Sequence, residues 1–227
     1  MTTTTSGQTA RLAPTHPTEL RTLARVAGVL GLTQVVLMFA AITQEVMDDH
    51  TTPAATLLHD YANVSLTRAF GGGYVEALSF IVLVPALVII ARVFGRGSEG
   101  TRAAAQTFLA LGIVFVASTL AVGFAPGAAA MYGAHHGADA TSVAMVNDLR
   151  NFGYYLQVAI QGGMAIALGV AALLGGQWRR VVGWGGVIVG SAVIVVTPFA
   201  QNALGMLWLV WWLALVVLLI KGGPQEA

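Results

Sequence analysis

Cysteine is absent from this chain of 227 residues, and charged residues are scarce. Without a thiol there is no disulfide framework, no thiolate metal site and no cysteine nucleophile. Asp, Glu, Lys and Arg make up only 9% of the sequence, whereas a soluble domain carries about a quarter. So few charges cannot cover the surface of a chain that is 56% hydrophobic. Lipid must solvate much of that surface, which predicts an integral membrane protein with the lipid bilayer as its first partner.

Several functional motifs are also missing. The sequence holds no G-x-S-x-G, no P-loop and no dinucleotide fingerprint, and no motif identifies a cofactor. Lys221 is the single lysine and follows the last apolar segment, which excludes a retinal Schiff base. The basic residues form no nucleic-acid surface, so no nucleic-acid partner is expected. Arg outnumbers Lys ten to one, a composition typical of GC-rich bacterial genomes.

Six apolar segments each come close to the ~20 residues that cross ~30 Å of hydrocarbon. They predict an all-α, polytopic membrane bundle of six transmembrane helices. A disordered tail is expected at residues 1–20, the transmembrane domain at 21–221, and a short C-terminal tail at 222–227. A run of helix-breaking residues at 197–202 predicts a tight hairpin between the last two helices. The six segments are residues 23–43, 73–93, 103–125, 151–174, 181–198 and 203–220.

The distribution of basic residues predicts the orientation. The basic clusters flank the ends of the helices on one side only, which the positive-inside rule makes cytoplasmic. The connections on the other side hold only Arg68 and Arg150. Both termini are therefore expected to be cytoplasmic, in a multi-pass protein of the inner (plasma) membrane. The two long connections on the other side, 44–72 and 126–150, are predicted outer loops, the first with a short helix near 54–62. Thr52 is its expected cap, with Pro53 at its first position. The basic residues on the cytoplasmic side are Arg11, Arg21, Arg25, Arg92, Arg96, Arg102, Arg179, Arg180 and Lys221.

Polar residues inside the apolar segments gather in the outward half of the bundle. Those on the fourth helix are spaced by 4, 3 and 4 residues, which puts them on one stripe. Glu76 should face the bundle, because a carboxylate in hydrocarbon is costly, and Arg150 at similar depth is its expected partner. An outward-facing polar cavity is therefore predicted among the first, second and fourth helices. Its expected ligand-binding residues are Glu76, Arg150, Tyr154, Gln157, Gln161, Gln34 and Gln44.

Three functions are compatible with such a cavity. The leading hypothesis is a non-enzymatic protein that binds a small amphiphile or lipid, or a membrane protein partner. An alternative is an integral-membrane enzyme acting on a lipid or isoprenoid, with Glu76 or Asp148 as its acid–base group. A third is a structural or assembly subunit of a membrane complex, in which the same polar groups only fix helix packing.

Histidines in the two outer loops raise the question of a metal. Imidazole and carboxylate together suit zinc or copper. The spacing matches no ligand signature, however, and no H-E-x-x-H is present. Solvated loop residues are the favoured interpretation, and no metal site is predicted. The weak candidates are His50, His59, His135 and His136.

Small and aromatic residues in the last three helices suggest how those helices pack. Gly186 and Gly190 form a G-x-x-x-G that favours close packing within the chain over a dimer face. Matching glycines on the fourth helix are Gly162, Gly163 and Gly169. The tryptophans of the sixth helix are expected to face lipid or to pack, with the lining of an apolar ligand cavity as the alternative. They are Trp208, Trp211 and Trp212.

Short stretches of the sequence match a known pattern. ARVAGVL (residues 24–30) opens the first helix, Gly137-Ala138-Asp139 precedes the fourth, and NFGY (residues 151–154) begins it. In these stretches the chain resembles the bacterial membrane-protein family catalogued as domain of unknown function 4386. A basic turn at residues 178–180 stands where that family often has a proline. The resemblance implies a bundle of six to seven helices and no particular activity.

Overall fold

A computed structural model describes residues 17–44, 50–176, 178–200 and 205–222 of the chain. Nearly all of these residues are helical, and none of them forms a strand. The elements are α1 (Pro17–Ile42), α2 (Ala54–Asn63), α3 (Leu66–Phe94), α4 (Glu99–Ser118), the π-helix η1 (Thr119–Phe124), α5 (Ala125–His135), α6 (Ala140–Gly175), the π-helix η2 (Arg179–Trp184), α7 (Gly185–Ala200) and α8 (Gly205–Ile220).

Five helical segments are long and apolar enough to cross a membrane, which confirms the prediction of a helical membrane protein. They are Thr18–Ile42, Leu66–Phe94, Glu99–His135, Ala140–Gly175 and Arg180–Phe199. The sixth, α8, is equally apolar but has 16 residues. At 1.5 Å per residue it is about 24 Å long, which is less than the ~30 Å of a hydrocarbon core. The sixth crossing therefore stays a prediction.

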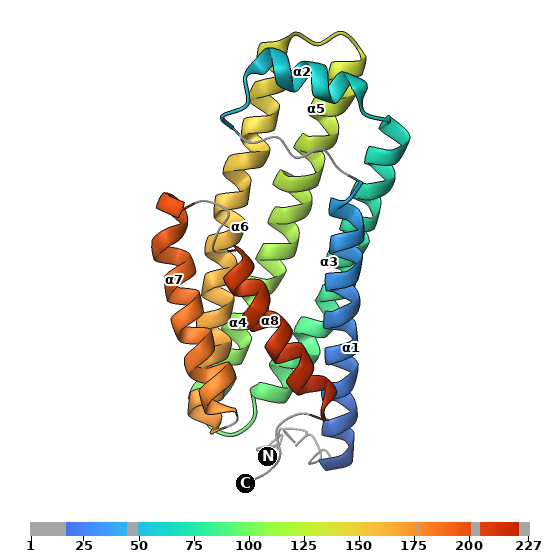
Figure 1. Cartoon of the computed structure of the whole chain (residues 1–227). Helices are drawn as coiled ribbons and strands as arrows, with labels where there is room; N and C mark the ends of the chain where they lie inside the picture. Colours follow the sequence, from blue (N-terminus) through green and yellow to red (C-terminus); the bar gives the residue numbers. More distant parts are fainter. Residues whose placement is uncertain (1–16, 45–49, 177, 201–204, 223–227) are drawn as a thin grey trace, which may run out of the picture.

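Successive long segments run antiparallel, so the start of α1 and the end of α8 lie at the same end of the bundle (Figure 1). There a Cβ on Gly28 would lie 2.7 Å from the Ile220 side chain, and one on Gly222 would lie 3.6 Å from the Arg25 guanidinium. We call this the terminal end and the opposite one, which carries α2, the distal end. Most of the described basic residues lie in or beside the helix ends at the terminal end, as the charge pattern predicted.

The distal end is more helical than predicted. The expected outer loop 126–150 is made of α5 and the first three turns of α6. Asp139 explains where α6 begins, because its carboxylate accepts hydrogen bonds from the Ser142 backbone N–H (3.0 Å) and hydroxyl (2.6 Å). With 36 residues, α6 is about 54 Å long. It is therefore longer than a bilayer is thick. Its distal turns pack with α2 and α5, and we call these three elements the distal cap.

The predicted short helix in the first outer loop is present as α2, which lies across the distal ends of α5 and α6 (Figure 1). Its buried Tyr61 donates a 2.7 Å hydrogen bond to Asn147 of α6. The expected cap was wrong: Pro53, rather than Thr52, occupies the N-cap position, and no side chain caps the helix. Leu57 and Tyr61 pack with Met131 and Val143 in a small apolar core that is separate from the main one.

The glycines of α6 and α7 face one another, as the predicted packing within the chain requires. A Cβ on Gly162 would lie 2.8 Å from the Gly190 carbonyl oxygen, and one on Gly190 would meet the Gly162 carbonyl. Two turns further along, a Cβ on Gly169 would lie 2.7 Å from the Gly183 carbonyl oxygen. Only glycine lets these two backbones approach so closely.

Two expected helix boundaries differ from those in the structure, and a third expected feature lies outside the described residues. The first helix begins at Pro17, so the last residues of the expected disordered tail are helical, while residues 1–16 lie outside the described residues. The α7 helix continues through Pro198 to Ala200. The tip of the hairpin that was predicted after it, at residues 201–204, is likewise outside the described residues.

Candidate functional site

A cavity of about 320 Å³ lies between α1, α3, η1 and α6, and the first turn of α8 closes one side of it. Small-molecule sites usually measure ~300–1,000 Å³, so this volume is at the lower end of that range. The cavity is bordered by Gln34, Met38, Ile42, Glu76, Phe80, Phe115, Thr119, Gly123, Arg150, Asn151, Tyr154, Gln157, Gln161 and Trp208.

Six of the seven residues that were predicted to bind a ligand border this one cavity. The exception is Gln44. It follows the last residue of α1, so it leaves the helical stripe on which Gln34 lies. Its Oε1 accepts a 3.0 Å hydrogen bond from Arg68 Nε, and another Arg68 nitrogen donates to the Thr43 carbonyl (3.1 Å). Gln44 thus fixes the end of α1 to the start of α3 rather than lining the cavity.

The α6 side of the cavity is a polar stripe. From Arg150 to Gln161 it covers twelve residues, or about 18 Å of helix. Two glycines of the neighbouring segment allow its side chains to fit. A Cβ on Gly123 would lie 3.3 Å from Gln157 Nε2, and a Cβ on Gly127 would lie 3.2 Å from Arg150 Cδ. The residues of this wall are therefore held against η1 and α5.

The opposite wall is formed by α1 and α3, which pack closely along their length. A Cβ on Gly72 would lie 2.6 Å from Gln44 Cβ and 3.3 Å from the Ala41 carbonyl oxygen. Because the two helices are antiparallel, Gln34 lies beside the turn of α3 that follows Glu76. Both residues border the cavity from this side.

Two buried amides in the cavity each have one atom without a hydrogen-bond partner. Gln34 is 3% exposed and its Oε1 has no partner, while Gln157 is 7% exposed and its Nε2 has none. The Gln34 amide nitrogen reaches only the Met38 sulfur, at 3.7 Å. A buried polar atom without a partner is costly, and a water molecule or a ligand in the adjoining cavity would satisfy these two. The indole nitrogens of Trp208, Trp211 and Trp212 are also unpartnered.

Aromatic rings close the cavity toward the terminal end. The ring centroids of Phe80 and Phe115 are 5.6 Å apart with an edge-to-face geometry, and those of Phe115 and Trp208 are 6.4 Å apart. Trp208 in turn stacks on Trp212 at 5.4 Å. The tryptophans of α8 are thus buried packing residues rather than lipid-facing ones, and Trp208 also borders the cavity.

Sequence reasoning did not predict the π-helix η1, which contributes Thr119 and Gly123 to the cavity. A signal was present at Pro126, which has no N–H to donate to the carbonyl four residues earlier. Loss of that bond disturbs the regular helical register at this point, and π-helical turns are frequent at functional sites. The apolar lining from Met38, Phe80 and Phe115 had no polar signature and was missed for that reason.

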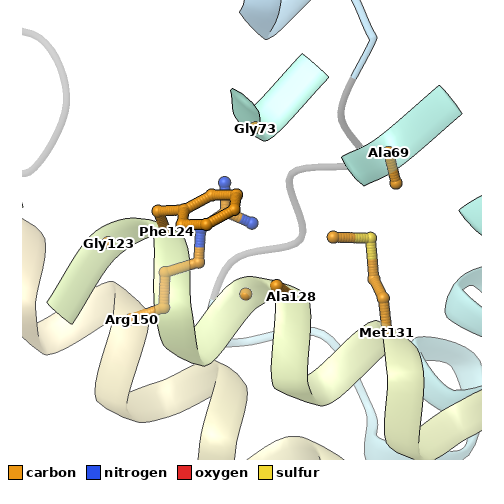
Figure 2. A pocket seen from close by; sticks show the side chains of 8 residues that line it. Ala69, Gly73, Gly123, Phe124, Ala128, Met131 and Arg150 are labelled. Atoms are coloured by element: carbon orange, nitrogen blue, oxygen red, sulfur yellow. The ribbon is translucent and has the colours of Figure 1, made fainter. Parts of the chain in front are cut away.

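Arg150 also borders a second, much smaller space of about 10 Å³, near the lower limit for one water molecule. Figure 2 shows its side chain reaching from α6 toward α3, with Phe124 of η1 beside it. A Cβ on Gly73 of α3 would collide with the Phe124 ring. Arg150 therefore occupies a tight niche between the cavity and the distal cap.

The structure does not bring the other candidate residues, Asp148 and the four histidines, together in this cavity. Asp148 is not among the residues that border the cavity. Across the described part of the chain, no three His, Cys, Asp or Glu residues come close enough to hold a metal ion. His135 Nε2 forms a 2.9 Å hydrogen bond with the Val64 carbonyl oxygen, and His136 stacks on Tyr132 with ring centroids 3.9 Å apart. His59 contacts Asn63, and His50 lies near Phe152. Each of the four histidines thus interacts with a different neighbouring residue.

Comparison of the chain with protein-family models, with curated proteins and with solved structures gives no match.

Proposed function

We propose that this protein binds the polar head of a small amphiphile in the cavity bordered by α1, α3, η1 and α6, from the outer side of the inner membrane. The observation that carries the proposal is the pair of buried, unpartnered amides, Gln34 and Gln157, in a space large enough for a ligand. Apolar walls with a few convergent polar groups are typical of small-molecule sites.

The outward orientation is part of the same proposal. It requires six crossings and cytoplasmic termini, and it is supported by the basic residues gathered at the terminal end. Membership of the family resembled by the sequence is compatible with this arrangement and remains a proposal as well.

A thermal-stability assay in mild detergent tests the proposal. Purified protein is heated with and without added amphiphiles, and native mass spectrometry identifies any amphiphile that co-purifies. We expect amphiphiles to raise the unfolding temperature of the wild type, and Glu76→Gln and Arg150→Ala to abolish that rise. The matched controls are Glu99→Gln and Arg102→Ala, which remove the same charges near the terminal end.

The helix content of each variant, measured by circular dichroism, separates loss of binding from loss of folding. Stabilisation that persists in both Glu76→Gln and Arg150→Ala would mean that the ligand binds elsewhere. An absence of stabilisation by any amphiphile, with none co-purified, would overturn the proposed function.

A further inference from the structure

The charges around the cavity are already engaged within the protein. Glu76 and Arg150 are the two charged residues that border it in the described part of the chain. Each of them interacts with another group of the protein, so they form part of the cavity wall, and replacing either disturbs that wall. An ion that entered the cavity would find no free counter-charge, and burying an unpaired charge is costly.

The polar groups that remain for a ligand are neutral. They are Gln34 on α1 and a row on α6 made of Tyr154, Gln157 and Gln161, which share one helix face. Gln34 Oε1 lacks a hydrogen-bond donor, and Gln157 Nε2 lacks an acceptor. The side chains of Tyr154 and Gln161 form no hydrogen bond with any other described residue. A ligand that satisfies this set must therefore both donate and accept hydrogen bonds.

Resting on the proposed function, we infer that the head group held in this cavity is uncharged and carries several hydroxyl groups, as a sugar or a glycerol head does. A hydroxyl donates and accepts through one atom, so two neighbouring hydroxyls satisfy both Gln34 and Gln157. An ether oxygen only accepts and an ammonium group only donates, so either would leave one of these amides unpaired. Phe80, Phe115 and Trp208 add apolar surface, which suits the C–H faces of a sugar ring.

Tyr154 lies at the edge of the cavity, next to the beginning of α8. Its side chain is 36% exposed, whereas those of Gln34 and Gln157 are buried. A Cβ on Gly205 would lie 2.7 Å from the Tyr154 hydroxyl oxygen, so the absence of a side chain at Gly205 leaves room for that hydroxyl. Gly205→Ala would displace the hydroxyl, and Tyr154→Phe would remove it, so the two variants test one group in different ways.

The experiment compares octyl amphiphiles that share one chain and differ in their head groups. They are titrated against the full-length protein, and native mass spectrometry measures the bound fraction. The protein is kept in a polyoxyethylene detergent, whose ether oxygens accept hydrogen bonds but cannot donate them. We expect octyl glucoside to bind at least about tenfold more tightly than octyl phosphocholine, octanoate or octylammonium, because each of these brings charge into a cavity without a free counter-charge.

Single substitutions test the neutral groups directly. Tyr154→Phe and Gln161→Leu should each weaken octyl glucoside by about two- to tenfold, as the loss of one neutral hydrogen bond allows. Gly205→Ala should weaken it in the same direction. The matched controls are Tyr155→Phe and Gln106→Leu, since neither residue borders the cavity, and both should bind as the wild type does. Circular dichroism shows whether each variant keeps its helix content.

Methyl glucoside, which lacks the octyl chain, distinguishes the two sources of such a head group. If it binds far more weakly than octyl glucoside, the head belongs to a lipid; if it binds as tightly, the ligand is a free sugar or polyol. Either result supports a neutral, hydroxylated head.

Charged octyl amphiphiles that bind as tightly as octyl glucoside would overturn this inference while leaving amphiphile binding in place. An affinity for octyl glucoside that both Tyr154→Phe and Gln161→Leu leave unchanged would also overturn it. Failure of every amphiphile to bind is a different result, which refutes the proposed function itself.

Discussion

Substitution of Gln157 by Leu should change stability and ligand binding in opposite directions. Gln157 is 7% exposed and its Nε2 has no partner. An unpartnered buried polar group costs about 1–3 kcal/mol, and leucine fills nearly the same volume without that cost. The ligand-free variant should therefore be more stable than the wild type by about 1–3 kcal/mol. For a chain of this size, this corresponds to a rise of about 2–12 °C in unfolding temperature.

The same substitution should remove most of the stabilisation by an amphiphile, because the donor that faces the ligand is lost. Thermal unfolding of delipidated protein, with and without amphiphile, measures both effects in one experiment. Gln106→Leu is the matched control, since Gln106 is exposed on α4 away from the cavity, and it should leave the ligand-dependent shift unchanged. A Gln157→Leu variant that is less stable without ligand, or equally stabilised by it, would refute the reasoning.

Three further predictions test the fold around the cavity. Gly190→Ala should destabilise the protein by about 1–3 kcal/mol through overpacking against α6, whereas Gly71→Ala, where an added Cβ meets nothing within 4 Å, should not; chemical denaturation compares the two. Hydrogen bonds from Ser142 lower the pKa of the Asp139 carboxyl from its ordinary value of 3.8. Asp139→Ala should therefore lower the unfolding temperature above pH 3.8, and the difference from the wild type should vanish as the pH falls through the lowered pKa. Thermal unfolding of both proteins as a function of pH measures this difference. In the cysteine-free background, Thr141→Cys should react with a membrane-impermeant thiol reagent added outside intact cells and Glu99→Cys should not; the reverse pattern would invert the proposed orientation.

Much of the site was predictable because polar side chains are energetically costly in the hydrocarbon core of a membrane. A Gln, Tyr or Arg in an apolar segment has few reasons to be there, so the i, i+4, i+7 spacing on the fourth helix already placed its side chains on one stripe. Glu76 and Gln34 followed from the same argument. Gln44 did not, because the pattern cannot show where a helix ends, and α1 ends two residues before it.

The distal end was misread for a related reason. Residues 126–150 are less apolar than a membrane span, so the hydropathy pattern alone assigns them to a loop. Outside the membrane, however, a helix needs only caps and an apolar face. Asp139 caps the start of α6, and Val143 packs against Leu57 and Tyr61 of α2. The π-helix η1 was equally invisible, because its register is a property of the backbone rather than of hydropathy.

The most direct test of the cavity uses the absence of native cysteine. Thr119 borders the cavity and is almost fully buried, so Thr119→Cys places one thiol inside it. We predict that a small methanethiosulfonate reagent labels this thiol in delipidated protein, and that an amphiphile slows the labelling, while labelling of the exposed control Thr107→Cys is unaffected. A thiol at residue 119 that reacts at the same rate with and without every amphiphile would contradict the claim that this cavity holds a ligand.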